Sequence, residues 1–355
     1  MKKICLFIPY MTGFGGTETV ITNLFAEYNR SQSNTELSLV NIGGFENGAW
    51  LEGVKDKQII WLSKNKWLRK IQYALFLPLI LYRQIKSKKE VDVVISTNPI
   101  MWFLLFWIKK ITHQDYRVMS WYHYSLSSKK VAQPLLKSAD GYLAISTGIA
   151  KQIVATGISE DKVKTIFNPI LKKSLSIPRT QTSDKCRFIY VGRVMLDGQK
   201  NLRATFEALS RVHGDWQLDV IGNGYSQEIK TLLTELGIKS HVKFTGFKED
   251  VWSGLTAVDG LLLSSKYEGL PMVLNEAISV GIPVLAFDCP TGPADIVNSQ
   301  NGILVPTDNL TAYVTELQKF IDRHYDFNQL AEIKDSIKKF YSENYFLTFM
   351  KSIEN

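Results

Sequence analysis

The sequence has few residues that could cross-link or anchor a fold. Its 355 residues include three cysteines, Cys5, Cys186 and Cys289, which lie far apart and form no C-x-x-C pair. That spacing argues against a disulfide framework or a zinc cluster, and it favours a reducing compartment with three buried thiols. The chain has no run of about 20 apolar residues, so no segment is expected to span a bilayer.

No cleavable leader is expected at the N-terminus, and the sequence has no D-x-D carboxylate pair. The apolar stretch after Lys2 and Lys3 is short and runs into glycines without a small-residue cleavage site. This pattern favours a first β-strand over a signal peptide, and the protein is expected in the cytoplasm. Without a D-x-D motif the sequence offers no carboxylate pair of that kind to a metal ion, and no metal is expected.

Positive charge is in excess and is concentrated in one segment. The formal net charge is +8, and residues 64–89 hold a cluster of lysines and arginines around an apolar core that Pro78 is expected to interrupt. Such a segment suits a helix in the membrane interface, where anionic headgroups attract its basic ends. The alternative is a core helix with solvated ends, but the aromatic run 102–107, followed by Lys109 and Lys110, favours the membrane. Nucleic acid is not expected, because no recognised binding motif accompanies the charge.

Compact apolar runs alternate with helical patterns along the chain, which predicts an α/β fold with two doubly wound, Rossmann-like parallel sheets. The domains are expected at residues 1–173, completed by a C-terminal helix at about 340–355, and at residues 185–335. The polar stretch 174–185 is expected to link them. Two such domains would face a central cleft, and a last helix near residues 333–353 would cross back to the first. The expected strands are residues 4–10, 37–42, 58–62, 91–96, 118–121, 141–145, 187–191, 216–221, 242–245, 260–264, 284–287 and 302–305.

A glycine-rich loop follows the first expected strand and precedes a helical stretch. Gly13, Gly15 and Gly16 would let backbone N–H groups approach a phosphate or a sugar at a helix N-terminus. The dinucleotide fingerprint G-x-G-x-x-G fails here, because Glu18 stands where its third glycine is required. A dehydrogenase of that type is therefore excluded, and a tight turn without a ligand stays open as the alternative.

Two cations follow the first strand of the second domain. Arg193 lies just past the strand end and Lys200 lies seven residues later, so both could neutralise a diphosphate at one strand terminus. The segment is not a Walker loop, because the spacing is one residue too long and Asn201 replaces the required Ser or Thr. The alternative is a surface charge pair.

The strongest motif is KYEGLPMVLNEA, residues 266–277, between two expected strands. Glu268 would lie in the loop and Glu276 two turns into the following helix, so both could face one elongated ligand. Backbone N–H groups of residues 269–272 would point at a phosphate from the helix N-terminus. Residues 292–295 look like a second helix start of this kind. The alternative is an acidic cap with a solvated glutamate.

One histidine, His123, follows an expected strand of the first domain. At a strand end it could hydrogen-bond a sugar hydroxyl or take a proton. A structural histidine is equally consistent with this position.

Taken together, these motifs resemble the retaining glycosyltransferases of family 4, which have the GT-B fold, over nearly the whole chain. The likeness is greatest to the lipopolysaccharide-core 1,6-galactosyltransferases. It is carried by GFGGTETVI from Gly13, His123 with Ser125, AIS at 144–146, IFNP at 166–169, FIYVGR at 188–193, GQK at 198–200, EGLPMVLNEA at 268–277 and TGPAD at 291–295.

The resemblance implies roles for several of the matched residues. Arg193 and Lys200 would bind the donor diphosphate, Glu276 the ribose hydroxyls, and Glu268 would lie by the donor sugar. Arg193, Lys200, Glu268 and His123 are the expected catalytic residues. The remaining donor-binding positions would be Gly15, Gly16, Gly222, Phe247, Gly269 and Leu270.

The implied reaction is metal-independent transfer of a hexose from a UDP-sugar, UDP-galactose or UDP-glucose, with retention of configuration. The leaving phosphate itself would accept the proton of the acceptor. The acceptor would be a lipid-linked glycan, a lipopolysaccharide core or a surface polysaccharide, reached from the inner face of the cytoplasmic membrane. A nucleotide-sugar epimerase or hydrolase and a non-catalytic GT-B partner subunit are the alternatives. The two cations together with the two glutamates favour transfer.

Overall fold

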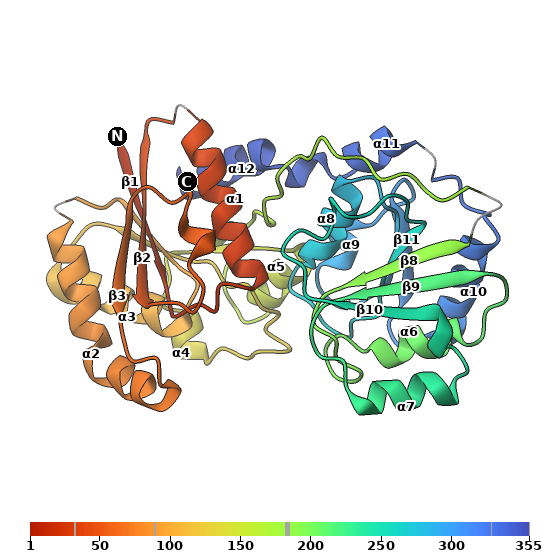
Figure 1. Cartoon of the computed structure of the whole chain (residues 1–355). Coiled ribbons are helices and arrows are strands. Elements are labelled where there is room, and N and C mark those ends of the chain that lie inside the picture. The colour runs from red at the N-terminus through yellow and green to blue at the C-terminus, as the bar shows by residue number, and fades with distance from the viewer. Residues whose placement is uncertain (32, 89, 182–184, 328, 355) are drawn as a thin grey trace. The chain divides into compact units, whose positions relative to one another are not determined.

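The computed structural model divides the chain into two compact units, which are described one at a time (Figure 1). The first unit comprises Met1–Pro169 and Ser342–Asn355, and the second comprises Ile170–Tyr341. The structure describes residues 1–355 except 32, 89, 182–184, 328 and 355. One end of the basic segment 64–89, part of the expected linker and the last residue of the C-terminal helix region therefore lie outside the described residues.

The first unit is built on a parallel sheet of seven strands in the order β3-β2-β1-β4-β5-β6-β7. Six of these strands overlap predicted segments. The edge strand β7 was missed, because its three residues are only half-buried and form no apolar run. The strands are β1 (Lys2–Ile8), β2 (Thr35–Gly43), β3 (Lys57–Trp61), β4 (Val93–Ser96), β5 (Arg117–Ser120), β6 (Gly141–Ala144) and β7 (Val163–Thr165).

Helices cover this sheet, and α1 shows why the sequence folds that way. Val20, Ile21, Leu24 and Phe25 recur at helical spacing and are buried. The C-terminal helix α12 packs on α1 within the same unit, as the prediction of a helix that crosses back required. The helices of this unit are α1 (Gly16–Arg30), α2 (Lys66–Ser87), α3 (Pro99–Thr112), α4 (Gln133–Leu136), α5 (Thr147–Val154) and α12 (Ser342–Glu354), with short 3₁₀ turns η1 (Ala49–Leu51) and η2 (Glu160–Lys162).

Helix α2 differs from its prediction in one respect, since it runs through Pro78 without interruption. Asn65 caps its N-terminus by accepting from Trp67 N and Leu68 N at 2.9 and 3.3 Å. Leu77, Leu81 and Ile85 pack inward at a spacing of four residues. This buried stripe holds the helix together across the proline.

The second unit repeats the topology with six parallel strands in the order β10-β9-β8-β11-β12-β13. In Figure 1 its helices α6, α7 and α10 lie on one face of the sheet, and α8, α9 and α11 lie on the other. The elements are β8 (Cys186–Val191), α6 (Leu202–Leu209), β9 (Trp216–Ile221), α7 (Gln227–Glu235), η3 (Lys239–His241), β10 (Val242–Gly246), β11 (Gly260–Leu263), α8 (Met272–Ser279), β12 (Val284–Asp288), α9 (Pro293–Ile296), β13 (Gly302–Pro306), α10 (Leu310–Ile321), α11 (Leu330–Asp335) and η4 (Lys338–Phe340).

The expected linker is wrong for its described residues. The chain passes between the units at Pro169–Ile170 and again at Tyr341–Ser342, so residues 174–181 belong to the second unit. Ile177 is buried there and donates its N–H to Val280 O at 2.7 Å. This isolated apolar side chain contributes to docking the segment, and the polar pattern around it concealed that role.

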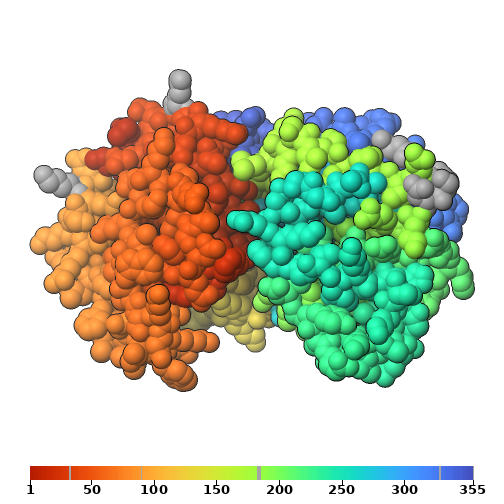
Figure 2. All heavy atoms as spheres, in the orientation of Figure 1, coloured from red at the N-terminus to blue at the C-terminus, as the bar shows by residue number. Residues whose placement is uncertain are grey.

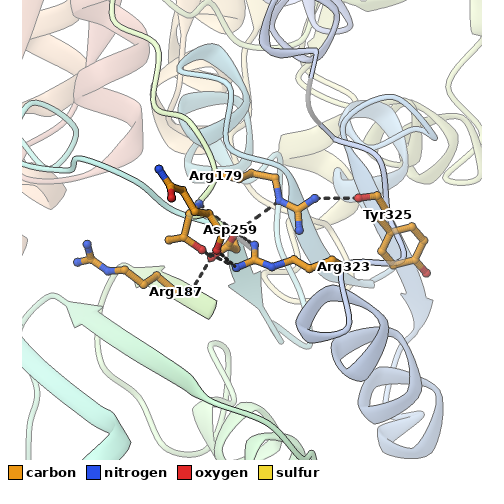
Figure 3. A network of polar contacts seen from close by, with 7 residues as sticks. Arg179, Arg187, Asp259, Arg323 and Tyr325 are labelled. Atoms are coloured by element: carbon orange, nitrogen blue, oxygen red, sulfur yellow. Dashed lines mark hydrogen bonds and ion pairs between the residues drawn. The ribbon is translucent and has the colours of Figure 1, made fainter. Parts of the chain in front are cut away.

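Buried charge fixes the same segment to the second unit (Figure 3). Asp259, fully buried just before β11, contacts the guanidinium groups of both Arg179 and Arg323. It also accepts from Thr180 Oγ1 at 2.6 Å and from Arg187 N at 2.8 Å. Three segments that are distant in the sequence therefore meet at one carboxylate.

The predicted helix near residues 333–353 is two helices. Helix α11 ends at Asp335, η4 follows, and α12 begins at Ser342. Between η4 and α12 the backbone extends at Tyr341, and Phe340 O accepts from Ile170 N at 2.8 Å. No helix in the described ranges combines the length and apolarity needed to cross a bilayer.

Candidate functional site

The charged residues of the second unit meet at the carboxyl ends of β8 and β11. The loop after β8 carries Arg193 and Lys200, and the loop after β11 carries Glu268. Lys200 Nζ lies 2.7 Å from Glu268 Oε1, and both side chains are largely buried. Since β8 and β11 are neighbours where the strand order reverses, the pair lies at the switch point at which doubly wound sheets bind ligands.

Gln199 connects the two motifs, and sequence reasoning gave it no role. Its Oε1 accepts from Arg193 Nη2 at 2.9 Å, while its Nε2 lies 3.4 Å from Glu268 Oε2 and 3.3 Å from Tyr267 O. Its main-chain oxygen accepts from Lys266 N at 2.9 Å. The signal in the sequence was its place in the GQK motif, directly before Lys200.

Three glycines bring the loops of this edge close together. A Cβ on Gly222 would lie 1.8 Å from Gly192 O, so no side chain fits there. Gly222 N donates to Gly246 O at 2.9 Å, and Gly192 N donates to Ile221 O at 3.0 Å. The predicted donor-binding Gly222 therefore has a packing role that is independent of any ligand. After the third glycine, Phe247 exposes 55% of its surface at the end of β10.

The loop that ends in α8 presents unbonded backbone donors. Pro271 caps α8, and within the described chain no group accepts from the N–H groups of Gly269, Leu270 or Met272. These donors lie at the positive end of the helix dipole and suit an anion. Leu270 itself is buried and anchors the loop.

Glu276 lies in the second turn of α8, as predicted. Burial raises the pKa of its carboxyl group above the ordinary value, and the nearby Lys173 opposes this shift. Its side chain is half-buried and forms no hydrogen bond to the residues that the structure describes. A carboxylate without a partner here can accept hydrogen bonds from ligand hydroxyls.

The predicted second helix start at residues 292–295 packs against the loop that carries Glu268. Helix α9 is a single four-residue turn. A Cβ on Gly292 would lie 2.8 Å from Gly269 O, and Thr291 Oγ1 donates to Glu268 O. This turn therefore supports the loop that carries Glu268.

In the first unit the glycine loop is held by an acidic side chain that the sequence analysis used only to exclude a fingerprint. Glu18 is buried, and its Oε1 accepts from Gly13 N at 2.9 Å. A Cβ on Gly15 would lie 2.6 Å from Glu18 Oε2. Gly15 caps α1 without a side-chain bond, and Gly16 opens the helix. The loop is a turn held by Glu18 that leads into α1. Binding of a phosphate or a sugar by its backbone stays a prediction.

His123 lies two residues after Trp121, beyond the end of β5. Its ring centroid is 4.7 Å from that of Trp121, which in turn lies 6.0 Å from that of Phe349 on α12. Burial lowers the pKa of His123 to about 3, so the imidazole is neutral near pH 7. Its Nε2 is buried and has no partner among the described residues. This nitrogen can bond a hydroxyl group, but it is a weak base.

Among the described residues, no group of three or more His, Cys, Asp and Glu side chains is arranged to hold a metal ion.

Two doubly wound units, with a cation–carboxylate pair at the switch point of the second, are the arrangement expected of a GT-B glycosyltransferase. A family model described as glycosyl transferases group 1 matches residues 185–323. The chain is 32% identical over 350 residues to a lipopolysaccharide 1,6-galactosyltransferase of Escherichia coli strain K12, covering 97% of this chain and 96% of that protein. The chain belongs to the family of glycosyltransferases that includes this enzyme.

Solved structures agree with this assignment. The lipopolysaccharide outer core galactosyltransferase WaaB, in its apo form, matches with a TM-score of 0.85 and 31% identity over 99% of both chains. HepE of Anabaena in complex with UDP-glucose matches with a TM-score of 0.76 over 100% of both chains, but at 17% identity it shows the fold alone. The predicted resemblance, the GT-B fold class and the assignment as a hexosyltransferase are confirmed. The roles of individual site residues stay predictions.

Proposed function

We propose that this enzyme transfers a hexose from a UDP-sugar, UDP-galactose or UDP-glucose, to a lipopolysaccharide core, with retention and without a metal cofactor. A lipid-linked glycan or another surface polysaccharide is the wider acceptor class. The meeting of Arg193, Lys200 and Glu268 at the switch point carries the proposal. The name of the Escherichia coli relative supports the acceptor, and the UDP-glucose bound to HepE supports the donor.

The second unit holds the nucleotide. Arg193 and Lys200 neutralise the diphosphate, and the N–H groups of Gly269 and Leu270 add donors from the start of α8. Glu276 accepts hydrogen bonds from the ribose hydroxyls. Phe247, exposed at the end of β10, lies beside the base, and Gly222 keeps the neighbouring loop close.

Catalysis then consists of stabilising the departing negative charge. Two cations and a helix N-terminus do so without reorganisation, because the protein holds them in place before reaction. Glu268 lies by the donor sugar, and Lys200 exchanges part of its contact with this carboxylate for the phosphate. The phosphate oxygen that leaves the anomeric carbon accepts the proton of the acceptor hydroxyl.

In the first unit, Gly15 and Gly16 approach the phosphates or the sugar with backbone N–H groups. His123 bonds a sugar hydroxyl through its unpartnered Nε2. The sequence allowed two roles for His123, hydrogen bonding to a sugar hydroxyl or accepting a proton. A neutral imidazole suits the first role, because a base with a pKa of about 3 is too weak to accept a proton efficiently near pH 7.

The proposal includes a cytoplasmic location and attachment to the inner face of the membrane through α2. The outward face of this helix exposes apolar side chains, and Figure 2 shows its orange atoms at the surface of the first unit. Neither α2 nor the adjoining α3 contains an acidic residue. Anionic headgroups complement this charge, and acyl chains complement the exposed side chains. The exposed large hydrophobic residues of α2 are Trp67, Leu68, Ile71, Leu75, Phe76, Leu79 and Tyr82.

The first experiment is a thermal-shift panel of UDP, GDP and their sugars, with and without EDTA. A ligand at about 100 times its Kd stabilises by about 2.7 kcal/mol. We expect the UDP series to raise the unfolding midpoint and EDTA to change nothing. Arg193→Ala should abolish most of the shift, whereas Arg211→Ala, at an exposed position of the same unit, should keep it.

Radiolabelled sugar transfer from the stabilising donor to lipopolysaccharide that lacks its outer core then tests the acceptor. A protein that no nucleotide stabilises would contradict the donor assignment. Loss of activity in EDTA, restored by a divalent cation, would contradict metal independence.

A further inference from the structure

The amide of Gln199 lies between groups of opposite hydrogen-bonding character. The guanidinium of Arg193 can only donate, whereas the carboxylate of Glu268 and the carbonyl of Tyr267 can only accept. The amide meets both demands, with Oε1 toward the arginine and Nε2 toward the two acceptors. Its partners therefore fix its orientation, and the reversed amide would face a donor with a donor.

Because the Gln199 amide is neutral, it does not cancel the positive charge of Arg193. Lys200 is paired with Glu268, but in the described part of the chain Arg193 has no ion pair. A carboxylate at position 199 would neutralise Arg193 and repel Glu268. The glutamine holds the arginine while leaving its positive charge for an anionic ligand.

The backbone around Gln199 is fixed independently of its side chain. Gly198 and Asn201 adopt positive φ angles of 78° and 49°. Asn201 Nδ2 donates to Ser264 O at 3.2 Å, and Lys266 N donates to Gln199 O at 2.9 Å. Replacing the side chain should therefore leave the loop folded.

We infer that Gln199 is a positioning residue of the donor site, which acts by holding the Arg193 guanidinium and the Glu268 carboxylate in place for the donor diphosphate and sugar. The inference rests on the proposed function and adds a residue to it. Gln199 restricts the rotamers of a long, exposed arginine before the donor arrives. Glu268 is also held by Lys200 at 2.7 Å, whereas Gln199 provides the side-chain hydrogen bond to Arg193, so we expect the main effect of Gln199 to pass through Arg193.

The test compares Gln199→Met and Gln199→Glu with wild type and with Gln227→Met, an exposed control at the start of α7. We expect Gln199→Met to lower kcat about tenfold with a smaller change in KM for the donor, because an unrestrained arginine stabilises the transition state less. The isosteric Gln199→Glu keeps the packing but removes the hydrogen-bond donor Nε2 and adds a negative charge. Its kcat should therefore fall further, by about a hundredfold. Gln227→Met should match wild type.

A double-mutant cycle separates positioning from a general structural role. Arg193→Ala alone should lower kcat about a hundredfold. Adding Gln199→Met to this variant should change kcat by less than about twofold, because the side chain it positions is gone. Additive losses, or a Gln199→Met variant within twofold of wild type, would overturn the inference while leaving the proposed function intact. A wild type without donor binding or transfer would overturn both.

Discussion

At the scale of single residues, His123 has a lowered pKa because it is buried just beyond the end of β5. The ring lies against Trp121, and its buried Nε2 has no partner among the described residues. Burial penalises the charged form and lowers the pKa to about 3. The neutral histidine is thus suited to hydrogen bonding. Its lowered pKa can be tested through the pH dependence of the free energy of unfolding.

We predict that wild type loses stability as the pH falls below about 6.5, the ordinary histidine pKa. Between that value and about 3 the unfolded chain binds a proton that the folded chain does not, so stability rises with pH. His123→Gln should reduce the loss between pH 7 and pH 5 by up to about 2 kcal/mol. Urea unfolding at both pH values measures this, with His324→Gln as the control at an exposed position. An unchanged pH dependence in His123→Gln would show that folding does not lower the pKa of His123.

At the scale of elements, α2 has apolar residues on two sides. One stripe, with Leu77, Leu81 and Ile85, packs into the first unit. The other includes Ile71 and Leu75, which expose 53% and 66% of their surface. A single buried face is enough to hold a surface helix, so the second face points to an additional binding partner.

Leu75→Glu should weaken binding to vesicles that contain anionic lipid by about thirtyfold. That factor corresponds to roughly 2 kcal/mol for one leucine no longer buried in the bilayer. Leu347→Glu, on α12 with a similar exposure of 61%, introduces the same charge away from this face and serves as the matched control. Vesicle flotation measures the binding. Equal binding of both variants would contradict attachment through α2, and a change in sedimentation coefficient for Leu75→Glu alone would identify the face as a contact between copies of the chain.

At the scale of the whole molecule, buried contacts join segments of the second unit that are distant in the sequence. Asp259 forms ion pairs with Arg179, which precedes β8, and with Arg323, which follows α10 (Figure 3). Removing one member of such a network leaves the other charges buried and unpaired.

Asp259→Asn should destabilise the second unit by about 3–5 kcal/mol, because two arginines lose their common carboxylate. Asp215→Asn, which breaks the exposed pair with Lys185 at 3.3 Å, should cost no more than about 1 kcal/mol. Calorimetric unfolding of both variants makes the comparison. A stable Asp259→Asn variant would mean that the network contributes little to this unit.

The sequence by itself determined the two sheets and the positions of the charged motifs. Strands buried on both faces form continuous apolar runs, and a run is a local property of the chain. The short edge strand β7 was not predicted, because it has no such run. Arg193, Lys200 and Glu268 could be placed after strands for the same reason.

Only the tertiary structure decided which of these residues meet. The contact of Lys200 with Glu268 and the bridge through Gln199 depend on β8 lying beside β11, and strand order is not encoded in any local pattern. The close packing at Gly222 and the docking of Ile177 likewise depend on neighbours distant in the sequence. A hydrophobic pattern specifies that a segment is buried, but its partners are chosen by packing across the whole unit.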